Sequence, residues 1–365
     1  MIQPPSIDSS IHDRSVQRPV LGIESSCDET AAAVLAHGGV VLSNVVASQT
    51  TVHEKFGGVV PELAARAHIS RINEVVMDAM TQAHLSMNEL GAIAVTQGPG
   101  LAGALLVGVN YAKGLSYGLG IPLIGVNHLE GHIASAWLAD STFPLPCVVL
   151  VVSGGHTHLY RKEQSGHCCL LGCTRDDAAG EAFDKGAQML GLEFPGGQAI
   201  DRLARQGDAN VIPFPRFHQR KTSLEFSFSG LKTSLLYTLR KMNDQTRAEQ
   251  MADLAAGYQE AIVQVLVTKA FAALAHTGLS ALAVVGGVSA NSRLRALLVE
   301  RSEREGVRLA LPPLAYCTDN AAMIALAGQQ MLLADPQLGR HVDIQPSLQH
   351  NVVRQSVHHK ESAHS

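Results

Sequence analysis

The sequence has few aromatic residues, little charge and no long apolar run. Aromatic residues make up 4% and charged residues 16% of its 365 residues, against 46% hydrophobic residues. The core is therefore aliphatic, and the length suits two domains or one large α/β unit. No run of about 18 apolar residues occurs, so we expect no membrane span. Residues 1–18 are polar and lack the apolar core of a secretion signal, which favours a cytoplasmic protein.

Cysteine and basic charge are also scarce. The six cysteines form no Cys-x-x-Cys pair, which argues against a disulfide framework in a long cytosolic chain. Cys168, Cys169 and Cys173 can be read as a soft metal site, but their apolar surroundings favour a strand. A net charge of −4 argues against a strongly basic nucleic-acid binder. If the chain acts on RNA, it must use a partner's surface or a local patch such as 216–221, which reads equally well as a solvated loop.

Predicted strands alternate with predicted helices, which indicates an α/β fold. Residues 19–46 read as a strand hairpin whose polar tip is 25–30. Residues 147–161 repeat the pattern around the polar turn 153–157. The two units barely match in sequence, yet the repeated pattern suggests a duplicated domain with a ligand between its halves.

The helical pattern is clearest in four places. We predict helices at 62–85, 293–305 and 321–333 and a long amphipathic helix within 245–276, with further strands at 92–96 and 281–285. Residues 289–292 can cap the helix that follows them. Residues 1–18 read as a disordered leader, and the polar, His-rich tail from 335 is expected to be loose.

Two histidines, His128 and His132, are four residues apart in a predicted helix. They project from one face, which is the spacing that two imidazole ligands of a metal need, and Asp319 is the candidate third ligand. Such pairs are more often surface or packing residues. A zinc-protease helix fits poorly, because Glu130 lies roughly 200° round the helix from His128 and would point away from the metal.

Glycine-rich turns follow several predicted strands. Ser153-Gly-Gly155 and Gly286-Gly287 let the backbone N–H groups approach a ligand closely, and the second leads into a helix N-terminus, which suits an anion. Neither matches a P-loop or dinucleotide fingerprint. Each is either a tight turn or part of a phosphate site.

Carboxylates gather at two places. In the segment 176–185, an acidic helix face is the plain alternative, but Phe183 argues that Asp184 lies at a buried edge and binds a ribose hydroxyl or an amine. Glu24, Asp28 and Glu29 gather at the first hairpin tip, where they can position a nucleophile or a cation. Lys232, in the compact loop 226–232, is a plausible counter-charge.

Taken in order, these motifs resemble the TsaD (Gcp, YgjD) family of tRNA adenosine threonylcarbamoyltransferases, in its bacterial or organellar version. The resemblance extends from residue 20 to about residue 330. The matching stretches are 21–30, 57–66, 98–101, 128–132, 152–156, 176–185, 195–197, 226–232, 286–291 and 317–320.

The resemblance implies a two-domain fold of the actin/hexokinase/Hsp70 (ASKHA) type. Residues 19–127 would form the first domain, completed by about 317–334. Residues 128–316 would form the second, followed by the polar tail 335–365. The two hairpins would be the paired phosphate-facing turns of this fold.

The resemblance also implies an activity. The family transfers the threonylcarbamoyl group from threonylcarbamoyl-AMP to N6 of adenosine 37, beside the anticodon of tRNAs that read ANN codons, to form t6A. His128, His132 and Asp319 match its metal ligands, with Fe²⁺ the usual metal and zinc possible in vitro. Asp28 and Glu29 match acidic positions linked to activity. The matching substrate positions are Val151, Val152, Ser153, Gly154, Gly155, Asp184, Gly197, Asp201 and Asn291.

The partners implied are tRNA, a fold-related non-catalytic subunit that lacks the metal site, and a P-loop ATPase subunit. Two other functions stay open. One is a metallo-endopeptidase, since the family was long labelled a glycoprotease. The other is a non-catalytic nucleotide-binding subunit, which should lack the His128, His132 and Asp319 set that this chain keeps.

Overall fold

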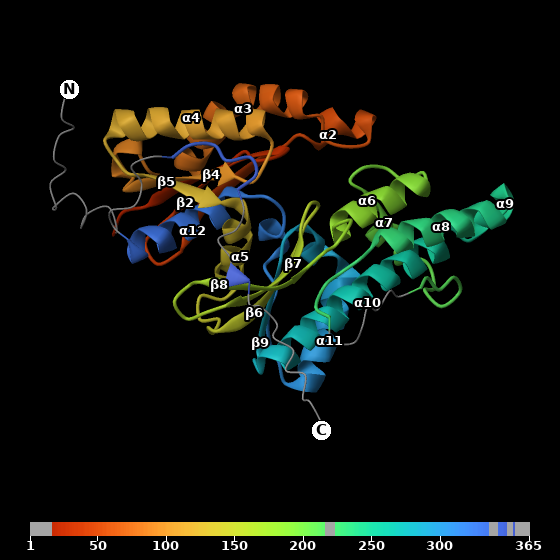
Figure 1. Cartoon of the computed structure of the whole chain (residues 1–365). Coiled ribbons are helices and arrows are strands. Elements are labelled where there is room, and N and C mark those ends of the chain that lie inside the picture. The colour runs from red at the N-terminus through yellow and green to blue at the C-terminus, as the bar shows by residue number, and fades with distance from the viewer. Residues whose placement is uncertain (1–16, 216–222, 336–341, 349–352, 355–365) are drawn as a thin grey trace.

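The computed structural model describes residues 17–215, 223–335, 342–348 and 353–354. The protein contains two β-sheets, each covered by helices (Figure 1). The α/β prediction is therefore confirmed. Most of the leader, the basic stretch 216–221 and much of the tail lie outside the described residues.

The first sheet has the strand order β3-β2-β1-β4-β5. Its strands are β1 (Val20–Glu24), β2 (Glu29–Leu35), β3 (Val41–Ser48), β4 (Ala92–Gly98) and β5 (Leu123–Asn127). The central strand β1 pairs antiparallel with β2 and parallel with β4. The predicted first hairpin is thus confirmed, with its polar tip at the carboxyl end of β1.

Helices cover both faces of this sheet. They are α2 (Thr50–His53), α3 (Pro61–Gln82), α4 (Ala102–Leu119), α5 (His128–Ala139) and α12 (Ala321–Ala334). Ile23 of β1 packs with Val76 of α3 on one face, and Val20 packs with Ile324 of α12 on the other. Side chains alternate across a strand, so β1 is buried on both sides.

The second sheet has the strand order β10-β9-β6-β7-β8-β11. Its strands are β6 (Cys147–Val152), β7 (Thr157–Lys162), β8 (Cys168–Cys173), β9 (Ala281–Val285), β10 (Arg308–Ala310) and β11 (Val353–Arg354). The central strand β6 pairs antiparallel with β7 and parallel with β9, the same arrangement as around β1. The second predicted hairpin is confirmed, and the cysteine-rich stretch is the strand β8.

The remaining helices pack beside this sheet. They are α6 (Ala179–Met189), α7 (Gly196–Ala204), α8 (Ser229–Lys241), α9 (Asp244–Glu249), α10 (Met251–Thr277) and α11 (Ser292–Glu305). The predicted amphipathic character of α10 is wrong. Its buried residues point in all directions because α10 packs against β6, α7 and α11 at once.

Two features connect the halves. Helix α5 lies between the sheets, where Ala134 joins the core around α12 and Ile133 joins the core around β6 and β9. Part of the tail is ordered rather than loose: Gln345 N donates to Gln97 O at 2.7 Å, and Val353 pairs in parallel with β8. Backbone hydrogen bonds hold these segments, so the polar composition did not reveal them.

Candidate functional site

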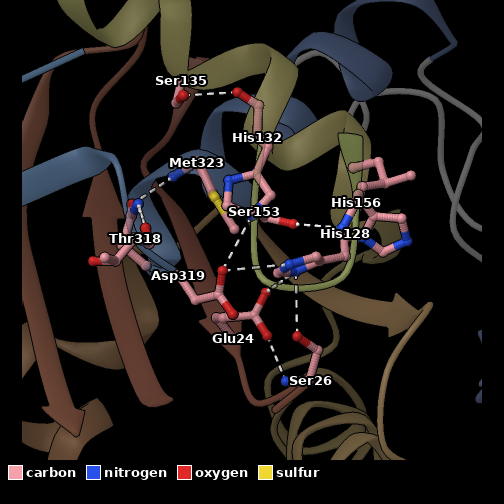
Figure 2. A network of polar contacts seen from close by, with 12 residues as sticks. Glu24, Ser26, His128, His132, Ser135, Ser153, His156, Thr318, Asp319 and Met323 are labelled. Atoms are coloured by element: carbon pink, nitrogen blue, oxygen red, sulfur yellow. Dashed lines mark hydrogen bonds and ion pairs between the residues drawn. The ribbon is translucent and has the colours of Figure 1, made fainter. Parts of the chain in front are cut away.

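Two histidines of one helix and a distant aspartate meet between the two sheets. His128 and His132 open the first turns of α5, directly after β5, and Asp319 precedes α12 (Figure 2). Asp319 Oδ1 lies 3.4 Å from His128 Nε2 and 3.1 Å from His132 Nε2. Among the described residues, this is the group of histidine, cysteine and acidic side chains whose ligand atoms lie close enough to hold one metal ion.

Glu24 fixes the orientation of His128. Its fully buried carboxylate accepts hydrogen bonds from Thr96 Oγ1 at 2.6 Å and the backbone N–H of Ser26 at 2.5 Å, and it lies 3.0 Å from His128 Nδ1. With Nδ1 as the donor to Glu24, Nε2 is the His128 nitrogen that faces Asp319 and can bind a metal ion there. A carboxylate behind a histidine is the usual support of a metal-binding imidazole.

The charges of this cluster also suit a cation. Burial alone would raise the pKa of Asp319, but the imidazoles of His128 and His132 hold it well below its ordinary value. Burial alone would lower the pKa of His128, and the carboxylates of Asp319 and Glu24 outweigh it. His132 Nδ1 is buried and has no hydrogen-bond partner in the described part of the chain. Two acceptor-rich carboxylates around two imidazoles therefore fit a divalent metal of the kind that binds nitrogen and oxygen ligands.

The first hairpin tip carries the two acidic residues predicted to matter for activity. Glu29 begins β2, and Ser48 Oγ donates to its carboxylate at 3.4 Å. Burial, together with the charges of Asp319 and Asp28, raises the pKa of Glu29 to about 9. A raised pKa favours the protonated form of Glu29, in which the carboxyl can donate a hydrogen bond.

The second hairpin tip is built from backbone. Val151 and Val152 are buried within β6, and the predicted substrate residues after them are Ser153, Gly154 and Gly155. Ser153 O and Gly154 O accept from the first N–H groups of α6. The N–H groups of Gly154 and Gly155 have no partner among the described residues, and both glycines are exposed. They are free to bind an anion.

His156 follows these glycines and closes the second tip, where its N–H donates to Ser153 Oγ at 3.2 Å. Burial, with the charges of His158, His128 and His132, lowers its pKa to about 4. Its ring packs against that of His158, with the ring centroids 5.4 Å apart, and Figure 2 includes His156 among the residues around the cluster.

The other predicted substrate residues hold helix N-termini. Asp184 accepts from Gly196 N at 2.9 Å, next to Gly197 at the start of α7. Asp201 accepts from Ser292 N at 3.1 Å and Ser292 Oγ at 2.7 Å. Asn291 caps α11 through Leu294 N, as the sequence predicted for 289–292. Asp201 and Asn291 thus lie together at one helix end, where an anion is favoured.

Other candidates lie elsewhere. Glu130 Oε2 is 3.7 Å from Lys162 Nζ, an arrangement that agrees with its predicted direction away from the histidine pair. Lys232 is exposed on α8, and the loop before it is held instead by Asp176, which accepts from Phe228 N at 2.8 Å. Within the described ranges, no cysteine belongs to the candidate metal group.

The comparisons with known proteins identify the family. A family model described as TsaD, tRNA N6-adenosine threonylcarbamoyltransferase, matches residues 40–326. The protein of that name from Syntrophus aciditrophicus (strain SB) is 53% identical over 313 residues, which are 86% of this chain and 92% of that protein.

The chain belongs to the tRNA N6-adenosine threonylcarbamoyltransferase family. It is therefore a transferase enzyme, as predicted. A further relative of the same name, from Clostridioides difficile (strain 630), is 49% identical over 308 residues, 84% of this chain and 91% of that protein.

More distant solved structures share the fold of this threonylcarbamoyltransferase family member. HypF of T. kodakarensis matches with a TM-score of 0.57 and 13% identity, covering 87% of this chain and 48% of that one. Component A of Acidaminococcus fermentans (R)-2-hydroxyglutaryl-CoA dehydratase matches with a TM-score of 0.52 and 17% identity, covering 87% and 99%. The predicted two-domain ASKHA-type fold is confirmed. None of the enzyme's helices in the described ranges has the length and apolar character needed to cross a membrane.

Several residues of the site were not singled out by the sequence. Thr96 and Ser26 hold Glu24 and His128, and His68 holds the first tip by contacts to Thr30 Oγ1 at 2.7 Å and Cys27 O at 2.9 Å. The one sequence feature that could have pointed to these supporting residues was Glu24, an acidic residue at the end of an apolar strand.

Proposed function

We propose that this enzyme transfers the threonylcarbamoyl group from threonylcarbamoyl-AMP to N6 of adenosine 37 in tRNAs that read ANN codons, forming t6A with the help of a bound metal. The observation that carries the metal-assisted part is the meeting of His128, His132 and Asp319 between the two hairpin tips, with Glu24 behind His128. The group transferred is inferred from the family name that the relatives share.

His128, His132 and Asp319 are proposed to hold Fe²⁺, with zinc as a substitute in vitro. The bound ion would supply Lewis-acid polarisation and a template for the acyl donor. Glu24 keeps His128 in the tautomer that presents Nε2, and the burial of the cluster keeps water from competing for the ligand atoms.

The second hairpin tip is proposed to hold the adenylate. The exposed N–H groups of Gly154 and Gly155 suit its phosphate. The N-termini of α7 and α11, held by Asp184 and Asp201, suit its ribose end. Asn291 and Gly197 would complete this binding surface. These contacts orient the acyl donor, which matters because the exocyclic amine of adenosine is a weak nucleophile.

The proton of the attacking amine needs an acceptor. As N6 attacks the carbonyl carbon, the bond to the phosphate oxygen breaks and AMP leaves with the electron pair. Burial is the first cause of the raised pKa of Glu29, about 9, and a raised pKa suits a hydrogen-bond donor. We therefore assign the acceptor role to Asp28 and a hydrogen-bond donor role to Glu29.

The proposed setting is the cytoplasm, where the enzyme works with tRNA, a fold-related non-catalytic subunit and a P-loop ATPase subunit. A peptidase function is not favoured, since Glu130 pairs with Lys162 instead of facing the histidines. A purely binding role is not favoured either, because the histidine–aspartate set is intact.

The test is reconstitution. Purified protein, partner subunits, Fe²⁺, threonylcarbamoyl-AMP and unmodified tRNA are incubated, and t6A is scored by mass spectrometry of nucleosides. We expect product with wild type and with His276→Ala, an exposed histidine at the end of α10. Product should fall at least 100-fold with His132→Ala and Asp319→Asn, together with the metal content.

Lack of product from wild type, with metal and partners confirmed present, would contradict the transfer reaction. If Asp319→Asn made as much product as wild type, only the proposed role of the metal would be contradicted, and the transfer reaction would stand. Thermal unfolding of each variant separates loss of the metal from loss of the fold.

A further inference from the structure

The exposed surface of α8 carries only basic charges, unlike that of α11 in the same half of the molecule. Leu231, Leu235 and Leu239 are buried and hold the helix to its neighbours. The exposed residues Lys232, Leu236, Tyr237, Arg240 and Lys241 cover the rest of the helix surface, with Lys232 and Lys241 at its two margins and Arg240 between them. In Figure 1, α8 lies on the outside of the molecule beside α6 and α10.

The charge on this face is of one sign. Helix α8 contains no acidic residue, and Lys232, Arg240 and Lys241 make no ion pair with any described residue. Helix α11 shows the ordinary alternative, since Arg301 Nε lies 2.7 Å from Glu305 and Arg304 lies 3.8 Å from Glu300. Unpaired cations on a chain with a net charge of −4 indicate an anionic partner.

The position of α8 relates this face to the candidate site. Asp176 lies just before α6, the helix that carries Asp184. It accepts a hydrogen bond from Ser229 Oγ at 2.8 Å and so holds the first residue of α8 beside the start of α6. Lys232 and Arg240 are about 12 Å apart along the helix axis, at 1.5 Å per residue. Such a row can follow several phosphates of a nucleic-acid backbone.

We propose that Lys232, Arg240 and Lys241, with Tyr237, bind the sugar–phosphate backbone of tRNA and so present its anticodon arm to the site. The proposal rests on the proposed function. The cations neutralise phosphates and carry no sequence information, so they position the RNA. Tyr237, with 58% of its surface exposed, offers a ring on which a base can stack.

The first experiment measures binding with the full chain and its partner subunits. The dissociation constant of unmodified tRNA is measured by fluorescence anisotropy between about 50 and 200 mM KCl, the range over which phosphate contacts are strongly screened. Arg240→Gln with Lys241→Gln is compared with Arg301→Gln with Arg304→Gln, which removes the same charge from α11. We expect the α8 variant to bind about tenfold more weakly, and its salt dependence to fall by a slope of about 1.5, since each lost phosphate contact is worth about 0.7–0.9.

Equal losses in both double variants, or no loss in either, would overturn the proposal. The proposal would also be overturned if the α8 variant no longer bound a partner subunit but, without any partner, bound tRNA as well as wild type does. Arg240, Lys241 and Arg304 are exposed, whereas Arg301 is half-buried against the Phe271 ring, so the thermal midpoint of each double variant must match that of wild type before the binding data are compared.

The second experiment separates this proposal from the proposed function. In the transfer assay the α8 variant should raise KM for tRNA about tenfold and leave kcat unchanged at saturating tRNA. If wild type makes product and the α8 variant has an unchanged KM for tRNA, the proposal that α8 binds tRNA is overturned while the proposed function stands. No product from wild type would contradict the proposed function, whereas the binding comparison would still decide the surface.

Discussion

The tips of the β1–β2 and β6–β7 hairpins lie at equivalent places in the two sheets, yet they are built from different groups. Each follows the central strand of its sheet, which pairs antiparallel with one neighbour and parallel with the other. The first tip is made of buried side chains, of which Glu24 and Ser26 contact His128. The second consists of exposed glycine backbone at Gly154 and Gly155.

This difference suggests a division of labour in a duplicated framework. Buried carboxylates in fixed positions suit a metal, because they orient its imidazole ligands and exclude water. Exposed N–H groups suit a phosphate, since glycine lets the ligand approach the backbone. The comparison can be tested by perturbing one tip at a time and measuring metal and adenylate binding separately.

The largest expected effect is that of Glu24→Gln on metal binding. The substitution keeps the shape but removes the charge behind His128 Nδ1, so the affinity for Fe²⁺ should fall about 10- to 100-fold. Competition with a chromophoric chelator measures this without reference to activity. The matched change at the second tip is Ser153→Ala, which should leave metal affinity unchanged. Equal losses in both variants would remove the proposed division between the tips.

Crowding each tip through a neighbouring glycine should give a second, smaller contrast. A Cβ at Gly100 would lie 2.6 Å from Ser26 O, and one at Gly180 would lie 2.6 Å from Ser153 O. Both contacts involve backbone, so Gly100→Ala and Gly180→Ala should each cost about 1–3 kcal/mol of unfolding free energy. We expect Gly100→Ala to weaken metal binding and Gly180→Ala to weaken adenylate binding, by calorimetry with a non-hydrolysable analogue. The reverse pattern would show that the tips are not specialised as described.

Local patterns in the sequence predicted the strands and turns of both tips. They did not predict most of the contacts between residues that are far apart in the sequence. Strand periodicity and the polar turns located both hairpins, and helical spacing placed His128 and His132 on one face of α5. The contact of Glu24 with His128 joins residues 104 positions apart, and no local pattern encodes it.

The same limit explains the other differences. Asp201 was matched to a substrate position by resemblance, but its role as an acceptor at the α11 N-terminus depends on a residue 91 positions away. The tail was expected to be loose because its composition is polar, yet backbone hydrogen bonds to Gln97 and to β8 hold parts of it. Amino-acid composition does not predict backbone pairing, because every residue type except proline has both a backbone N–H donor and a backbone C=O acceptor.

The smallest expected effect concerns pH and the helices around the second tip. Burial alone would raise the pKa of Asp176, but hydrogen bonds from Ser227, Phe228 N and Ser229 outweigh it and lower the pKa. A lowered pKa in the folded state means that the contribution to stability is fully present above the ordinary aspartate pKa and is lost as the pH falls through the folded value. Asp176→Asn should therefore cost about 1 kcal/mol at pH 7, as for the loss of a helix cap.

This difference between wild type and Asp176→Asn should shrink as the pH falls below about 4, where the unfolded wild-type chain takes up the proton, and vanish once the folded carboxyl is protonated too. Chemical unfolding of both proteins at several pH values measures it, with far-ultraviolet circular dichroism as the probe. Glu89→Gln is the matched control in the first half, because Ser86 likewise lowers the pKa of Glu89. If acid narrows the gap for Glu89→Gln but leaves that for Asp176→Asn unchanged, the hydrogen bonds of Asp176 do not hold the start of α8 in solution, and the surface of α8 would need another anchor beside the second tip.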